Sequence, residues 1–209
     1  MLIFSDKHRA RIEKFVRSLG GKEELPFTPE KDLQELLSHS MIGVECENSL
    51  WKSKVMPNYG APLTPKKRLG GKPGLNKNAV VPTVILKEED LVPLNKWQDT
   101  HKIKVHIWHV FFDQAFGLSF DKAKSLISKG LIEPKVQTYQ APAGATTRKT
   151  IYQVYYHYAY ELGISTEEPS LEPACIEDKN GHILPYVVFK GGKLKLTEEA
   201  LNTLRKLNQ

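Results

Sequence analysis

Residues 79–112, AVVPTVILKEEDLVPLNKWQDTHKIKVHIWHVFF, contain the pattern that decides the fold. The first nine, residues 79–87, are rich in β-branched residues and almost continuously apolar, which predicts a strand covered on both faces. Residues 88–101 predict a helix, because acidic residues fill the first turn and apolar residues recur at helical spacing. Residues 102–112 alternate at first and then become fully apolar, as expected of an interior strand. This order of elements favours an α/β core.

Further elements are predicted on both sides of this core. Helices are expected over residues 6–19, over residues 29–39 after a capping Thr28, over residues 114–129 before Gly130, and after Thr197. Apolar residues 41–46 predict a strand that follows the second of these helices.

The last third of the chain has a different pattern. A tyrosine-rich strand follows a loop of small residues, and the dipeptides Asn180-Gly181 and Gly191-Gly192 are typical of turns between antiparallel strands. We therefore expect a single domain over residues 1–209, with a mixed central sheet flanked by helices and an antiparallel C-terminal part.

The composition excludes several classes of protein. The chain has 209 residues, 40% of them hydrophobic, a formal net charge of +6 and only two cysteines. No apolar stretch is long enough to cross a bilayer, and the charged N-terminus lacks the apolar middle of a signal peptide, so we expect a cytoplasmic protein. Cys46 and Cys175 cannot form a disulfide framework or a cysteine-rich zinc site, and we expect both to be buried.

Basic residues are concentrated in one window. Residues 48–87 contain no acidic residue and eight basic ones, and prolines and glycines predict a long irregular loop over most of this window. Such a loop can follow a phosphate backbone, although it can equally be a solvated linker. The predicted phosphate contacts are Lys52, Lys54, Lys66, Lys67, Arg68, Lys72 and Lys77.

Two glutamates precede this loop. Residues two apart on a strand face the same way, so Glu45 and Glu47 project together from the strand over residues 41–48. Two adjacent carboxylates repel each other unless a cation lies between them, and Mg²⁺, or Mn²⁺ in its place, accepts one or two carboxylates together with phosphate oxygens and waters. This pair is therefore the candidate metal site, and the alternative is that both glutamates are solvated on an edge strand.

Other side chains could complete a catalytic site. Lys87, at the end of the strand over residues 79–87, could orient or deprotonate the water beside Glu45 and Glu47, with Lys52 and Lys54 as competing candidates. Glu35, on the preceding helix, could hydrogen-bond a metal-bound water, with Asp32 as a weaker alternative.

These residues resemble a known family. The sequences GVECENSLWK and ILKEEDLVPLNKW, on a helix–strand–strand–helix–strand order over about residues 28–113, are similar to the core of PD-(D/E)XK nucleases, and in particular to type II restriction endonucleases. The resemblance implies a nuclease core over about residues 28–130. It also implies a C-terminal part, residues 131–209, that serves DNA recognition or dimerisation.

The resemblance allows two assignments of the motif. Glu45-Cys46-Glu47 can be a variant E-x-E form of its second half, preceded by Asp32 or Glu35. Alternatively, Glu45 or Glu47 is the first acid and Lys87 is the catalytic lysine. We combine them, with Glu45, Glu47 and Lys87 acting together and Glu35 in support.

Base recognition is predicted for a polar, glycine-containing segment, residues 137–149, interpreted as a loop. Arginine and glutamine make the common major-groove contacts to guanine and adenine, although the segment can also be a mere connection. The predicted contacts are Gln140, Thr146, Thr147, Arg148 and Lys149. The tyrosines over residues 152–160 could stack on bases, but they favour a core or an interface.

The histidines favour structural roles. His106 and His109 lie three apart on a strand and face opposite sides, and His182 follows a turn signal. The resulting hypothesis is a magnesium-dependent restriction endonuclease that binds double-stranded DNA as a homodimer. The alternatives are a structure-specific repair or recombination nuclease and a nucleic-acid-binding protein without enzymatic activity.

Overall fold

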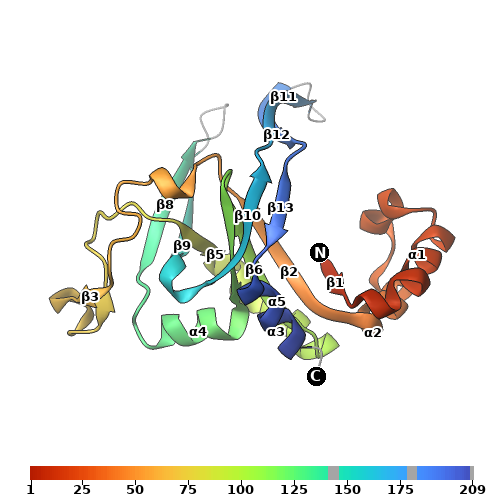
Figure 1. The fold of residues 1–209 in the computed structure, drawn as a ribbon, viewed down its shortest axis with the longest axis horizontal. Helices are drawn as coiled ribbons and strands as arrows, with labels where there is room; N and C mark the ends of the chain where they lie inside the picture. Colours follow the sequence, from red (N-terminus) through yellow and green to blue (C-terminus); the bar gives the residue numbers. More distant parts are fainter. Residues whose placement is uncertain (141–145, 178–182, 208–209) are drawn as a thin grey trace.

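The computed structural model describes residues 1–140, 146–177 and 183–207 as a mixed α/β fold (Figure 1). Its central sheet has six strands in the order β1-β2-β6-β7-β10-β13. Only β2 and β6 pair in parallel, and the other neighbours are antiparallel. The strands of this sheet are β1 Leu2–Phe4, β2 Ser40–Asn48, β6 Lys104–Val110, β7 Gln114–Ser119, β10 Tyr160–Glu167 and β13 Lys193–Leu196.

Helices cover both faces of the central sheet. On one face, helices α3 (Glu88–His101) and α4 (Phe120–Ser128) pack on the main core, which includes Ile107 and Phe120. On the other face, α5 (Glu198–Lys206) places Leu204 against Ile42 and Val44 of β2. The remaining helices, α1 (Arg9–Ser18) and α2 (Gln34–His39), belong to the N-terminal segment.

A second sheet packs on the same face as α3. It has three antiparallel strands in the order β5-β9-β8, namely β5 Thr83–Lys87, β9 Thr146–Tyr155 and β8 Pro134–Gln140. Val84 and Leu86 of β5 are buried in the main core beside Ile107 of β6. The strand before α3 was expected in the central core, but β5 pairs with β9 and belongs to this smaller sheet.

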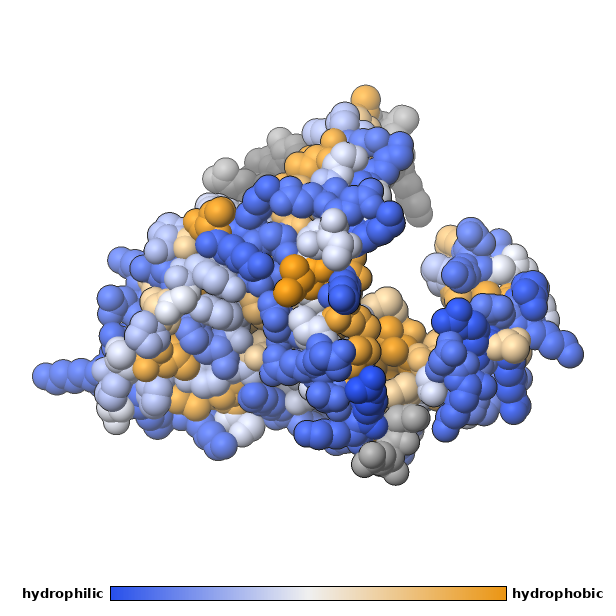
Figure 2. Space-filling model, in the orientation of Figure 1, coloured by the Kyte–Doolittle hydropathy of each residue, from blue (hydrophilic) through white to orange (hydrophobic). Residues whose placement is uncertain are grey.

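The remaining elements are short or project from the body. Strands β11 (Ser170–Glu177) and β12 (Ile183–Lys190) form a hairpin at the top of Figure 1. Figure 2 shows a hollow between the arm formed by β10–β13 and the mainly hydrophilic α1 region. Two short strands pair in the basic segment, β3 (Thr64–Pro65) and β4 (Pro73–Gly74). The 3-10 helices of the described residues are η1 Asp6–His8, η2 Lys22–Phe27, η3 Glu30–Leu33, η4 Ser53–Val55, η5 Lys67–Leu69 and η6 Tyr156–Tyr158.

Several predicted elements agree with this structure. Helix α3 spans the predicted residues, α1 and η1 occupy the first predicted helix, and Thr197 Oγ1 caps α5 by accepting a hydrogen bond from Ala200 N. The basic segment contains only short elements, as its prolines and glycines indicated. Within the described residues no helix is long and apolar enough to cross a membrane.

Four local predictions were wrong. The helix expected over residues 114–129 begins only at Phe120, because the apolar residues before it form β7 opposite β6. The strand expected over residues 79–87 begins at Thr83 and alternates between buried and half-buried residues, because its second face lacks full cover. Thr28 does not cap a helix, since its hydroxyl donates to the Glu24 carbonyl.

The fourth concerns Gly191 and Gly192, which do not close a hairpin. They join β12 to β13, and these strands belong to different sheets. Both glycines have positive φ, a backbone conformation that glycine adopts without a steric penalty. The Asn180-Gly181 turn signal lies outside the described residues.

Candidate active site

Glu45 and Glu47 lie on the face of the central sheet that carries α3. The parallel register pairs Gly43, Glu45 and Glu47 of β2 with Val105, Ile107 and His109 of β6. Because side chains alternate along a strand, all of these side chains point to the same face, toward the main core. The two glutamates are half-buried near the carboxyl ends of the parallel pair, and this location agrees with the predicted common orientation.

Lys87 reaches this pair from the second sheet. It is the last residue of β5, and its Nζ lies 2.5 Å from Oε1 of Glu47. The hydrogen bond from Lys87 to Glu47 is the largest cause that raises the lysine pKa, and the charges of Glu47, Asp90 and Glu45 raise it further while burial opposes them. Two acidic side chains of β2 and the ammonium group of Lys87 on β5 therefore come together from two different sheets.

Two further residues of this cluster were missed by the sequence argument. Asp90 lies in the first turn of α3, and its negative charge raises the pKa of Lys87. Its place in the acidic first turn of the helix that directly follows Lys87 could have indicated it.

The second missed residue is His109, which is 2% exposed and is paired in register with Glu47. Neither of its ring nitrogens has a hydrogen-bond partner among the described residues. Burial lowers its pKa to about 4, and the charge of Glu47 opposes this shift. The sequence correctly placed it on the face opposite to His106, whose Nδ1 lies 3.0 Å from the Tyr160 hydroxyl.

A cavity adjoins the acidic pair. It has a volume of about 470 Å³ and is lined by Glu45, by Trp97 of α3 and by residues of the N-terminal segment that include Met1 and Glu30. Glu45 is thus accessible from one side while Glu47 is engaged by Lys87.

The donors at this site suit a hard divalent cation in type. Within the described residues, no three His, Cys, Asp or Glu side chains are grouped so as to hold a metal. Glu45 and Glu47 supply two carboxylates, and Mg²⁺ characteristically takes only one or two from the protein and completes its shell with waters and substrate phosphate oxygens. The residues present therefore fit a cation that binds together with a phosphate substrate.

The other residues predicted for the catalytic site lie elsewhere. The carboxylate of Glu35 accepts a hydrogen bond of 2.7 Å from Arg11, and no described contact joins it to Glu45 or Glu47. Asp32 is exposed in η3. Two other lysines were candidates for the role of Lys87. Lys52 forms an ion pair with Glu168. The side chain of Lys54 is exposed, and its backbone N–H donates a hydrogen bond to Asp113. The proposed support from Glu35 stays a prediction.

The basic segment is held to the body by its own side chains. Lys66 donates to Asn76, Lys72 donates to the Lys129 carbonyl, and Arg68 contacts both Glu133 and the Leu75 carbonyl. Lys67 and Lys77 are exposed. Asp113, which was not predicted to contact this segment, holds its start in place. Its carboxylate accepts hydrogen bonds from Ser53 N, Ser53 Oγ and Lys54 N at 2.7 to 2.9 Å.

The segment predicted to read bases is largely a hairpin. Residues 134–140 form β8 and residues 146–155 form β9, in register from Gln140 opposite Thr146 to Pro134 opposite Tyr152. Because neighbours on a strand face opposite sides, Thr147 and Lys149 share one face and Arg148 lies on the other. The predicted contacts are therefore divided between the two faces of the strand pair, and Lys149 is paired with Glu89 at 2.5 Å. The side chains of Gln140 and Thr146 lie outside what the structure describes.

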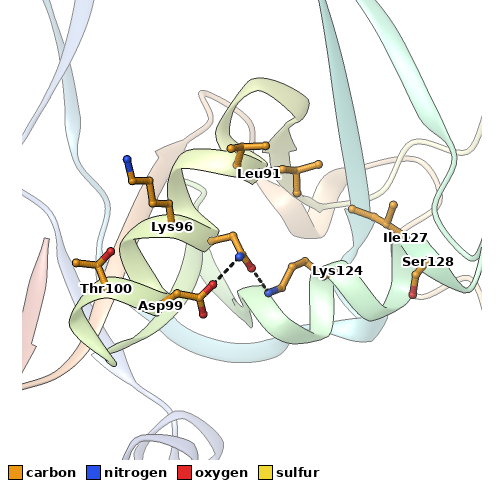
Figure 3. A pocket seen from close by; sticks show the side chains of 9 residues that line it. Leu91, Lys96, Asp99, Thr100, Lys124, Ile127 and Ser128 are labelled. Carbon is orange, nitrogen blue, oxygen red and sulfur yellow. Dashed lines mark hydrogen bonds between the residues drawn. The ribbon is translucent and has the colours of Figure 1, made fainter.

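Two other features lie apart from this cluster. Cys46 and Cys175 are exposed, so the prediction of buried cysteines was wrong. Cys46 shares a face of β2 with the buried Ile42 and Val44, but it lies further toward the end of the strand, where burial decreases. A larger groove of about 750 Å³ lies between α3 and α4, where Asn95 bonds both Asp99 and Lys124 (Figure 3). None of the residues lining this groove belongs to the predicted site.

One comparison with known proteins gives a match. The model of the AccI restriction endonuclease family matches residues 76–209, which is well over half of the chain. The matched region includes Lys87 and the second sheet, and it begins after β2. No curated protein and no solved structure matches the chain.

Proposed function

The chain belongs to the AccI restriction endonuclease family, and on this premise we propose that it hydrolyses DNA phosphodiester bonds at a specific short duplex sequence in a metal-dependent reaction. The observation that carries the chemical part of the proposal is the contact between Lys87 and Glu47, with Glu45 on the same face of β2. This arrangement agrees with the resemblance to PD-(D/E)XK nucleases.

The residues have distinct proposed roles. Glu45 and Glu47 would hold Mg²⁺ or Mn²⁺, and a bound ion of this kind lowers the pKa of a coordinated water and offsets charge that develops on the phosphate. Lys87 fixes the orientation of Glu47, and its remaining N–H groups can donate to a phosphate oxygen or orient the attacking water. The half-buried position of the three side chains strengthens these interactions relative to open water.

DNA binding is proposed for two surfaces. The exposed lysines of the basic segment, Lys54, Lys67 and Lys77, are available for phosphates, and the hairpin β8–β9 carries polar side chains that can reach base edges. We propose a homodimer, because a two-fold symmetric enzyme matches a palindromic site and can cut both strands. Sedimentation analysis with and without duplex DNA tests this state.

The decisive experiment is digestion of plasmid DNA with and without Mg²⁺. Discrete fragments that require the metal are expected, and sequencing of their ends gives the site. Glu45→Ala should abolish cleavage and retain binding, whereas Glu172→Ala, which changes a glutamate on the projecting hairpin, should cleave normally. Cleavage confined to branched substrates would indicate a structure-specific nuclease, and binding without cleavage under any metal would indicate a nucleic-acid-binding protein.

A further inference from the structure

A polar pocket lies on the outer side of the second sheet. It has a volume of about 310 Å³, and its walls come from residues 77–81 and from all three strands of the sheet. Two lysines from distant parts of the chain, Lys77 and Lys135, line it together with Thr83, Gln153 and Tyr155. Among the described residues that form its walls none is acidic.

The pocket is on the same face of this sheet as Lys87. Strand pairing places Lys87 opposite Ile151 and Ile85 opposite Gln153, and Lys135 lies opposite Ile151 from the other side. Since cross-strand partners and residues two apart share a face, Lys87, Gln153 and Lys135 all point away from the buried Val84 and Leu86. The pocket and Lys87 thus lie on the same face of the second sheet.

The distance between the pocket and Lys87 suits a nucleic-acid backbone. Thr83 in the pocket and Lys87 at the acidic pair are four residues apart on β5, which corresponds to roughly 13 Å along the strand. A DNA strand advances about 3.4 Å along its axis per nucleotide while its phosphates also wind around that axis, so phosphates at this separation are only a few nucleotide steps apart. One DNA strand can therefore contact both.

No carboxylate of the described residues neutralises the charge in this pocket. Lys135 Nζ donates a hydrogen bond of 2.7 Å to Gln153 Oε1, and neither Lys135 nor Lys77 contacts a carboxylate among the described residues. By contrast, Lys52, Lys87 and Lys149 are each paired with a glutamate. Burial, followed by the nearby charge of Arg68, lowers the pKa of Lys135.

We propose that this pocket binds a backbone phosphate of DNA, a few nucleotides from the phosphate that would lie at Glu45, Glu47 and Lys87. Lys77 and Lys135 supply the charge, Gln153 holds Lys135 in place, and the hydroxyls of Thr83 and Tyr155 are additional donors. This inference rests on the proposed nuclease function, and it assigns to Lys135, Gln153 and Tyr155 a role in positioning the substrate.

The test measures binding of a fluorescently labelled random-sequence duplex in EDTA over a series of salt concentrations. Each phosphate contact contributes about 0.9 to the slope of log affinity against log salt. Lys77→Ala combined with Lys135→Ala should lower the magnitude of the slope by about 1 to 2 and weaken binding by roughly tenfold or more near 0.1 M salt. Lys206→Ala, which removes an exposed lysine from α5 on the other face of the central sheet, should change neither quantity.

A second variant protects this test against loss of folding. Gln153→Glu keeps the shape of the side chain and places a carboxylate beside Lys135, so it should reproduce the loss of affinity while leaving the thermal unfolding midpoint close to wild type. If both variants bind DNA like wild type while the enzyme still cleaves plasmid with Mg²⁺, the proposed phosphate-binding role of the pocket is wrong and the proposed nuclease function is unaffected. A wild-type protein that neither binds nor cleaves DNA would overturn both.

Discussion

The Nζ of Lys87 and the Oε1 of Glu47 lie 2.5 Å apart, and the two residues belong to different sheets. Lys87→Met keeps the aliphatic length of the side chain but removes the ammonium group, so we predict a loss of cleavage of about 10²- to 10³-fold with DNA binding much less affected. Single-turnover cleavage of plasmid DNA measures this loss.

Lys87→Arg provides the matched comparison, because it keeps a positive donor at the same position. It should retain more activity than Lys87→Met, although the planar guanidinium cannot reproduce the compact ammonium group. Equal activity in wild type and Lys87→Met would remove Lys87 from the proposed chemistry.

Gly43 allows α3 to approach the central sheet closely. A Cβ atom at this position would lie 2.8 Å from a ring carbon of Trp97. We predict that Gly43→Ala destabilises the protein by about 1 to 3 kcal/mol, because the ring and its helix must move. Urea unfolding measures the change, and adding Trp97→Leu should recover part of it; no recovery would mean that another contact is responsible.

Asp113 anchors the start of the basic segment. Although burial raises the pKa of this carboxyl, hydrogen bonds from Lys54 N, Ser53 N and Ser53 Oγ outweigh it and lower the pKa. Asp113→Ala should cost about 2 to 3 kcal/mol, because it leaves the donors of the fully buried Ser53 unpaired. Limited proteolysis near residues 50–60 should become faster, whereas Asp99→Ala, at an exposed position on α3, should leave the cleavage pattern as it is.

His106 gives the protein a predicted pH dependence. Burial lowers its pKa to about 4, whereas the unfolded chain has the ordinary value of 6.5. Between these values the unfolded state binds a proton that the folded state does not, so stability falls as pH decreases from about 6.5 to about 4, by up to about 3 kcal/mol from this residue. His106→Gln should reduce the dependence of the unfolding free energy on pH over this interval, while His109, whose pKa burial also lowers to about 4, keeps contributing. An unchanged pH profile would contradict the prediction for His106.

The sequence predicted the local parts of this structure. Strand alternation placed Glu45 and Glu47 together, and the acidic first turn placed the beginning of α3 directly after Lys87. Both features depend on residues a few positions apart. Lys87 was expected beside the glutamates because it ends a strand, with the family resemblance in support, and this proximity agrees with the observed contact.

Features that depend on distant residues could not be predicted in this way. The pairing of β5 with β9 joins residues more than sixty positions apart, and nothing within β5 indicates its partner. Residues 114–119 are apolar at positions that suit either a helix or a strand, and pairing with β6 decided between them. By contrast, the β-branched residues in TTRKTIYQVY did signal the strand that the loop interpretation of residues 137–149 overlooked.

The parallel pairing of β2 with β6 has a practical consequence for work on fragments of this protein. A fragment that keeps only the family-matched residues 76–209 would lack β2 and leave the outer edge of β6 without hydrogen-bond partners. Buried side chains of β6 such as Val105 and Ile107 would lie beside that open edge, and such edges promote aggregation. The matched region alone is therefore expected to be poorly soluble. It would also contain Lys87 without its partner Glu47.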